Sequence, residues 1–282
     1  MSSDPAYSQS VAVKPPTVAR LVLDAFARPR RHRYGPHRIQ RADLYLPRGE
    51  GPHRVAILIH GGSWQAKYGR WVMRLLAADL VRRGVAVWNV GYRRVGRGEG
   101  GGWPATFDDV AAGIDALARV AEQRGDLDLE RAVVVGHSAG GQLALWAASR
   151  DDSAVDADRV VALAAVCDMS KADIARDVLG GSPEDVPERY DAVDPIRRVP
   201  LPVPALLVHG AEDQTVPVQR SREYAAAASA AGGDVELIEP PDTGHRAFVD
   251  PRSQAWRIAA QWILRPWTST ASPSTRSARS ST

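Results

Sequence analysis

The sequence is poor in cysteine and in long apolar runs. Its 282 residues include one cysteine, Cys167, so no disulfide can form within the chain. Because Cys167 follows an apolar run, we expect it to be a small core residue. No apolar stretch is long enough for a membrane-spanning helix, and residues 1–14 lack the apolar segment of a signal peptide. These absences predict a cytoplasmic protein without a membrane span.

The charge distribution gives little indication of a charged partner. The net charge is +3, and the basic excess gathers near the ends, at residues 28–33, Arg276 and Arg279. Such a run can indicate binding to nucleic acid or to an anionic membrane. No zinc-ligand spacing or RNA-binding signature accompanies it, so we interpret it as a solvated arginine-rich face. We expect neither a nucleic-acid partner nor a metal, and the oligomeric state is left open.

The chain alternates buried strands with helices. Hydrophobic residues make up 44% and charged residues 24%, which is typical of a globular protein. Strands are predicted at 38–47, 55–59, 85–90, 132–136, 160–167, 203–209 and 235–238. Helices are predicted at 70–83, 106–124, 142–149, 218–231 and 252–264, whereas 19–26 fits either a helix or a strand. This alternation predicts an α/β fold whose mostly parallel sheet is covered by helices on both faces.

One large domain is expected, at 18–266. Residues 1–17 are rich in Ser, Ala and Pro, and residues 267–282 are rich in Ser and Thr, so both ends are predicted to be disordered. Residues 168–200 are rich in Asp, Pro and Gly and lie between two predicted strands. Long irregular insertions of this kind usually serve function, so we expect a small lid or a pocket wall there.

A nucleophile elbow is predicted at residues 136–140. A β-branched run leads into Gly-His-Ser-Ala-Gly, and a helical pattern follows at once. Strand, sharp turn and helix form the context in which G-x-S-x-G exposes its serine above the sheet. Gly136 and Gly140 lack a Cβ, so the strand and the helix can close around Ser138. Ser138 is therefore the predicted nucleophile.

A serine hydroxyl needs a base, and the base needs a third group to orient it. The favoured acid is Asp213, which follows the predicted strand at 203–209. Glu212 is a rival, but its side chain should turn away from that of its neighbour on an extended loop. Asp168, after the preceding strand, is a second rival. The favoured base is His245, on the loop between the last strand and the last helix.

The other histidines fit the role of base less well. We expect His32, His37 and His53 to lie in polar segments. His60 and His209 should brace loops through hydrogen bonds, and His137 lies inside the elbow. The order Ser, Asp, His, each after its own strand, is that of the α/β-hydrolase triad.

An oxyanion hole is predicted from two turns. A tetrahedral intermediate carries negative charge on the former carbonyl oxygen, and backbone N–H groups stabilise it. Ala139 supplies one such group at a helix N-terminus, and the turn at 60–63 supplies more, from Gly62 and Ser63. A plain turn is the alternative interpretation of these glycines.

These motifs resemble the α/β-hydrolase superfamily. The quoted residues are HGGSW (60–64), GHSAG (136–140), the Asp213 loop and GHRAF (244–248). Within the superfamily they are similar to the esterase branch with an H-G-G-x-W oxyanion loop, which includes kynurenine formamidases and small carboxylesterases. The resemblance covers roughly 35–265 and implies an eight-stranded sheet, a serine triad and no cofactor. Ser63 replaces the third glycine of the hormone-sensitive-lipase-like branch, and the long N-terminal cap of that branch is missing.

The leading hypothesis is a serine carboxylesterase that acts on a small ester through an acyl-enzyme. The alternative is an arylformamidase-like amide hydrolase; a peptidase and a non-catalytic binding protein are less favoured. Four residues are predicted to shape the substrate pocket: Trp64, Tyr92, Trp103 and Met169. The identity of the substrate does not follow from the sequence.

Overall fold

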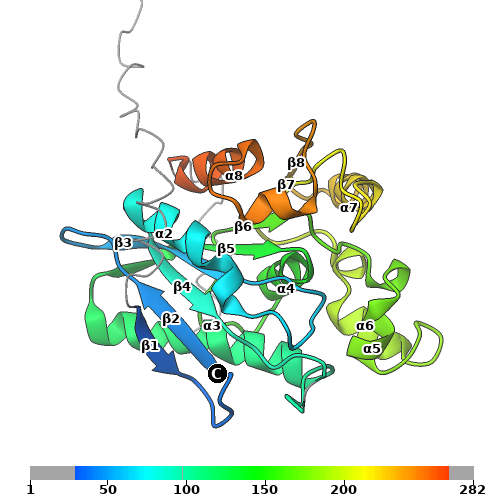
Figure 1. The fold of residues 1–282 in the computed structure, drawn as a ribbon, viewed down its shortest axis with the longest axis horizontal. Helices are drawn as coiled ribbons and strands as arrows, with labels where there is room; N and C mark the ends of the chain where they lie inside the picture. Colours follow the sequence, from blue (N-terminus) through cyan, green and yellow to red (C-terminus); the bar gives the residue numbers. More distant parts are fainter. Residues whose placement is uncertain (1–28, 97, 267–282) are drawn as a thin grey trace, which may run out of the picture.

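A computed structural model describes residues 29–96 and 98–266 (Figure 1). Its sheet has the strand order β1-β2-β4-β3-β5-β6-β7-β8. The strands are β1 (Arg30–Arg33), β2 (Arg41–Tyr45), β3 (His53–Ile59), β4 (Ala86–Val90), β5 (Leu127–His137), β6 (Arg159–Leu163), β7 (Ala205–Val208) and β8 (Val235–Ile238). The pairs β1–β2 and β2–β4 are antiparallel, and every other pair is parallel. The predicted mostly parallel sheet is confirmed.

Helices cover both faces of the sheet. The α-helices outside the β6–β7 segment are α2 (Arg74–Arg82), α3 (Ala105–Arg124), α4 (Ala139–Ala148), α7 (Gln219–Ala230) and α8 (Gln254–Leu264). Side chains of β3 alternate between two cores. Ile57 packs in the core that includes α3, α4 and α7, and Leu58 packs in the core that includes α2 and α8. This alternation follows from the two-residue period of a strand and explains the continuous apolar run.

The segment between β6 and β7 contains short helices. They are η2 (Met169–Lys171), α5 (Ile174–Leu179), α6 (Pro187–Val193) and η3 (Pro195–Arg198). In Figure 1, α5 and α6 lie at the opposite end of the molecule from the β2–β3 turn. The parallel strands end on the side of α5 and α6. The Gln142 side chain of α4 donates to Val193 O at 2.8 Å and ties α6 to the body of the domain. Action of this segment as a lid stays a prediction.

Several boundaries differ from the predictions. The helix expected at 70–83 is a 3-10 turn, η1 (Arg70–Met73), followed by α2. The strand expected at 160–167 ends at Leu163, although Cys167 is buried as predicted. Residues 30–33 of the arginine run form an edge strand, β1, in which the three arginines are exposed. The predictions for 1–17, 19–26 and 267–282 lie outside the described residues.

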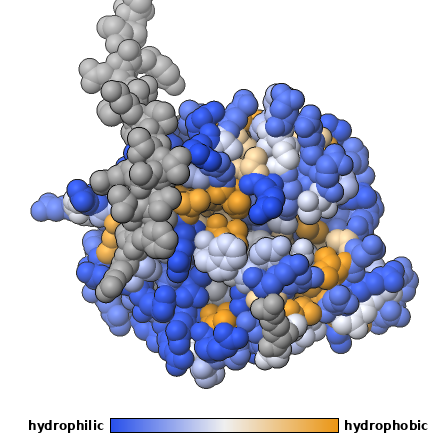
Figure 2. All heavy atoms as spheres, in the orientation of Figure 1, coloured by the Kyte–Doolittle hydropathy of each residue, from blue (hydrophilic) through white to orange (hydrophobic). Residues whose placement is uncertain are grey.

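The surface is mainly polar. Figure 2 shows hydrophilic side chains over most of the face drawn, with smaller hydrophobic patches between them. In the part of the chain that the structure describes, the exposed large hydrophobic side chains are Tyr68, Trp71 and Leu75, which gather around η1. No described helix is both long enough and apolar enough to cross a bilayer.

Candidate active site

Ser138 occupies a sharp turn between β5 and α4. Its backbone has φ 55° and ψ −121°, which is a strained conformation for a residue with a side chain. The turn is tight because two glycines meet: a Cβ on Gly136 would lie 1.9 Å from Gly140 O. A Cβ on Gly140 would in turn lie 2.2 Å from Ile59 O, on the neighbouring strand. The backbone therefore has the form predicted for an elbow.

His245 and Asp213 are joined directly. His245 begins the 3-10 turn η4 (His245–Val249), and its Nδ1 lies 2.7 Å from Asp213 Oδ2. Because a carboxylate only accepts, His245 Nδ1 carries the hydrogen. The other oxygen, Oδ1, accepts from the backbone N–H groups of Thr215 and Val216 at 2.8 and 2.9 Å. The Asp213 carboxylate is thus fixed at both oxygens.

Hydrogen bonds keep Asp213 charged although it is buried. Burial alone would raise the pKa of Asp213, but hydrogen bonds from His209, from His245 and from the backbone of Val216 lower it well below its usual range. A buried carboxylate that stays ionised can orient an imidazole and stabilise an imidazolium.

The elbow and the His245 loop touch through His137. His137 Nε2 donates to His245 O at 3.1 Å, and the two ring centroids are 4.8 Å apart. Burial, helped by the nearby His245, lowers the pKa of His137 to about 3, so His137 is neutral at pH 7. Among residues 29–96 and 98–266 there is no hydrogen bond between Ser138 Oγ and the His245 ring. Such contacts are often long in enzymes without substrate.

The two rival acids lie elsewhere. Glu212 is exposed whereas Asp213 is buried, as expected for neighbours on an extended loop. Asp168 Oδ1 accepts from the backbone N–H and the hydroxyl of Ser170, and Asp168 Oδ2 lies 3.4 Å from Lys171 Nζ. Asp168 therefore caps η2 and does not contact His245.

His209 is a contact of Asp213 that the sequence did not assign. Its Nε2 lies 2.9 Å from Val216 O and 3.3 Å from Asp213 Oδ2, and its Nδ1 lies 2.7 Å from Ser221 Oγ. Since both oxygens facing Nε2 only accept, Nε2 carries the hydrogen, and in the neutral ring Nδ1 accepts from the Ser221 hydroxyl. His209 braces its loop as predicted. The spacing of four residues to Asp213 was the available signal for the additional contact.

The turn at 60–63 packs against the elbow. Ile59 pairs with Gly136 in the β3–β5 ladder, so the two strands end side by side. A Cβ on Gly61 would lie 2.4 Å from His137 O and 3.0 Å from Ser138 Cβ, so only glycine allows this approach. Throughout the described ranges, no hydrogen bond of the protein uses the backbone N–H of Gly62, Ser63 or Ala139. These donors are the ones that the sequence named.

The residues predicted to shape the pocket are mostly buried. Trp64 and Met169 have 1% and 0% of their surface exposed, and Trp103 is half-buried against Phe107. The Tyr92 hydroxyl donates to His60 O at 2.6 Å, and its ring stacks on His60. Contact with substrate stays a prediction for all four, and the buried ones would need to become accessible. In the part of the chain described, no group of three or more His, Cys, Asp or Glu side chains could hold a metal ion.

The fold and these motifs were compared with known proteins. The BD-FAE family model matches residues 42–227, which is more than half of the chain. The chain belongs to the BD-FAE family. Together with the esterases among its relatives, this match confirms the prediction of an α/β-hydrolase esterase.

Curated proteins and solved structures are also similar to this chain. The uncharacterized protein YfhR of Escherichia coli strain K12 is 30% identical over 76% of this chain and 72% of its own. Esterase LipQ of Mycobacterium tuberculosis is 31% identical over 69% of this chain and 50% of its own. Among solved structures, Thermogutta terrifontis esterase 2 has a TM-score of 0.70 at 21% identity, over 86% of this chain and 97% of that chain. None of these relatives favours the arylformamidase alternative over a carboxylesterase-like hydrolase.

Proposed function

We propose that this BD-FAE family member hydrolyses a small carboxylic ester through an acyl-enzyme formed on Ser138. The observation that carries the proposal is the 2.7 Å contact between Asp213 and His245, on a loop that is hydrogen-bonded to the elbow residue next to Ser138. A serine needs this support because its hydroxyl is a weak nucleophile.

The first step is attack on the ester carbonyl. Ser138 Oγ bonds to the carbonyl carbon while His245 Nε2 takes the hydroxyl proton, and Asp213 stabilises the imidazolium that results. The carbonyl oxygen becomes an oxyanion, and we propose the N–H groups of Gly62, Ser63 and Ala139 as its hydrogen-bond donors. Each such donor typically contributes about 3 kcal/mol to the stabilisation of the transition state.

The second half of the cycle releases both products. His245 returns its proton to the leaving alkoxide, which departs as an alcohol and leaves the acyl group on Ser138. Water then attacks the acyl carbon while His245 takes one of its protons. The bond between the acyl group and Ser138 Oγ breaks, His245 returns the proton to Ser138 Oγ, and a carboxylic acid leaves. The neutral His137 beside His245 allows the imidazolium to form without a second positive charge next to it.

The test is hydrolysis of p-nitrophenyl acetate, butyrate and octanoate by the wild-type chain and by Ser138→Ala. We expect kcat to fall by at least about 10⁴-fold in the variant, because the nucleophile is lost. Ser229→Ala, at an exposed position of α7, is the matched control and should retain activity. Thermal unfolding should be similar in all three proteins.

Two outcomes would contradict the proposal. A Ser138→Ala protein that is folded and still hydrolyses these esters would remove Ser138 from the mechanism. A strong preference of the wild-type chain for N-formylkynurenine over every ester would assign the site to amide hydrolysis instead.

A further inference from the structure

A cationic cavity lies at the same edge of the sheet as the elbow. Its volume is about 380 Å³, which is within the usual range for small-ligand sites. It lies where β4 ends and before β2 begins, and the 66–74 stretch closes its other side. Its charged lining residues are Arg38, Lys67, Arg70, Arg74, Arg94 and Glu99.

The cations of this cavity exceed its anions. Glu99 is paired with Arg38 at 3.1 Å and with Arg94 at 2.7 Å. Arg70 is paired at 2.6 Å with Asp43, a buried residue of β2. The two carboxylates are therefore already shared among three arginines of the lining, and Asp43 also pairs with Arg31 at 3.1 Å.

Two cations of the lining have no such partner. No carboxylate of the described residues forms a salt bridge with Lys67 or Arg74, and the buried Nε of Arg74 has no hydrogen-bond partner. Like charges around one hollow repel each other, and an anion bound there would relieve the repulsion. Guanidinium groups are also the side chains best suited to carboxylate and phosphate groups.

Tyr68 connects this cavity to the predicted oxyanion turn. A Cβ on Gly62 would lie 2.4 Å from Cγ of the Tyr68 ring, so this ring packs directly on Gly62. Tyr68 also lines the cavity, and its carbonyl accepts from the Arg94 guanidinium. In the sheet, β4 is two positions from β5, so the strand ends at the cavity and at the elbow are about 10 Å apart. A small molecule can span that separation.

We infer that this cavity binds the anionic group, a carboxylate or a phosphate, of a small organic ligand beside the esterase site. The anionic group can belong to the ester substrate itself or to a separate small acid. The chemistry of recognition is the same in both cases, because Lys67 and Arg74 supply positive charge that no carboxylate of the described residues neutralises. Binding at the cavity does not require Ser138, whereas the substrate version rests on the proposed function.

The first experiment is calorimetric titration of the full chain with inorganic phosphate and with suberate at low ionic strength. We expect one equivalent of anion to bind the wild-type protein. Lys67→Met and Arg74→Met should each weaken binding by about tenfold, since each removes a charge-assisted hydrogen bond. Lys67 is exposed, so the Lys67→Met variant tests the inference even if Arg74→Met fails to fold.

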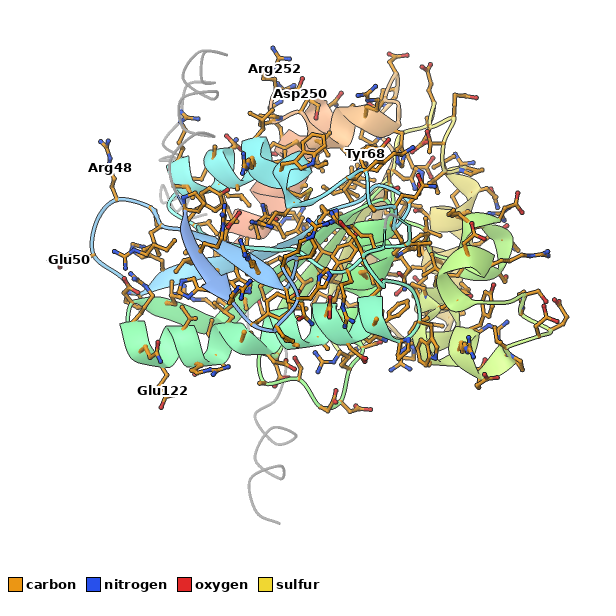
Figure 3. All side chains as sticks on the ribbon, turned by 60° about the horizontal axis from the view of Figure 1, so that its bottom comes forward. Arg48, Glu50, Tyr68, Glu122, Asp250 and Arg252 are labelled. Carbon is orange, nitrogen blue, oxygen red and sulfur yellow. The ribbon has the colours of Figure 1, made fainter. Side chains whose placement is uncertain are left out.

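The matched control is Arg119→Met, which removes one exposed positive charge from α3. Figure 3 shows Tyr68 near α2, whereas Glu122 of α3 lies on the opposite side of the sheet. Arg119→Met should leave binding unchanged. Failure of the wild-type chain to bind either anion would overturn the inference, and so would equal weakening by Arg119→Met and Lys67→Met, because net charge would then explain the effect.

The second experiment distinguishes the two sources of the anion. It compares mono-p-nitrophenyl suberate with p-nitrophenyl octanoate, which has the same acyl length and no second carboxylate. If the substrate supplies the anion, KM should be about tenfold lower for the suberate. Lys67→Met should abolish that difference, whereas the control Arg119→Met should keep it. Equal KM values together with bound phosphate would assign the cavity to a separate acid.

The two proposals fail in different ways. A chain that hydrolyses the octanoate but binds no anion overturns the cavity alone. If the wild type and Ser138→Ala bind phosphate equally well but neither hydrolyses any ester, only the proposed function is overturned.

Discussion

Asp213, on the loop after β7, and Asp194, between α6 and η3, are both buried, yet their pKa values differ. Each side chain is 0% exposed. The pKa of Asp213 lies well below its usual range, whereas that of Asp194 is raised to about 6. Desolvation disfavours the charged form of both groups, so burial does not explain the difference.

The difference lies in the hydrogen-bond donors. Asp213 has two backbone donors and two histidines. Asp194 has one strong donor, the backbone N–H of Met169 at 2.9 Å; its Oδ2 has no hydrogen-bond partner, with Arg197 Nε 3.9 Å away. The negative charge of Asp168 raises the pKa of Asp194 further. Donor number and placement, rather than depth, decide which carboxylate can serve beside an imidazole.

The largest effect is expected from Asp213→Asn. An amide has nearly the same volume as a carboxylate but cannot stabilise an imidazolium and can present the wrong group to His245 Nδ1. We expect kcat/KM for p-nitrophenyl butyrate to fall by about 10³ to 10⁴-fold. Asp194→Asn is the matched substitution and should stay within about threefold of the wild type. Equal losses in the two variants would show that any buried carboxylate near this edge is needed for activity.

An intermediate effect on stability is expected from Asp194→Asn. The pKa of Asp194 is higher in the folded chain, at about 6, than the usual unfolded value of about 3.9, so the folded state loses stability as pH rises through 6. The asparagine side chain of the variant has no such proton to lose. The free energy of unfolding of the variant, relative to the wild type, should therefore increase by about 1 kcal/mol between pH 5 and pH 8.

Urea unfolding at the two pH values measures this difference. A relative stability that does not change with pH, or that falls as pH rises, would mean that Asp194 is already charged at pH 5 in the folded chain.

The smallest effect is expected from Asp168→Asn. Asparagine keeps the oxygen that accepts from the backbone N–H of Ser170. It loses the contact with the half-exposed Lys171 and the negative charge that raises the pKa of Asp194. Such ion pairs contribute roughly 0 to 1 kcal/mol, so we expect a thermal midpoint within a few degrees of the wild type and unchanged kcat. A loss of activity comparable to that of Asp213→Asn would restore Asp168 as the acid.

Local patterns were sufficient for seven strands of the sheet and for the elbow, but not for the edge strand β1. The run before Ser138 is a buried strand because its apolar residues face both cores, and that property is visible in the sequence. The order of Ser138, Asp213 and His245, each after its own strand, also needs no three-dimensional information beyond a parallel sheet.

Contacts between distant segments were not predictable in this way. Trp64 and Met169 were assigned to the pocket from their positions in loops, yet both are buried. The contact of His209 with Asp213 depends on the conformation of the loop that joins them. In the cationic cavity, Arg38 and Arg94 are more than fifty residues apart in the sequence, yet both pair with Glu99. Composition and periodicity do not predict contacts between residues that are far apart in the sequence.

The pairing of Ile59 with Gly136 links the rate of hydrolysis to the register of the sheet. The proposed oxyanion donors follow two adjacent strands, so the hydrogen-bond register of β3 and β5 sets the distance between these donors. A slip of one residue would displace one turn from the other by about 3.3 Å and invert the side chains of a whole strand. The turnover rate therefore depends on the alignment of the central sheet, and a normal kcat requires that β3 and β5 are paired in this register.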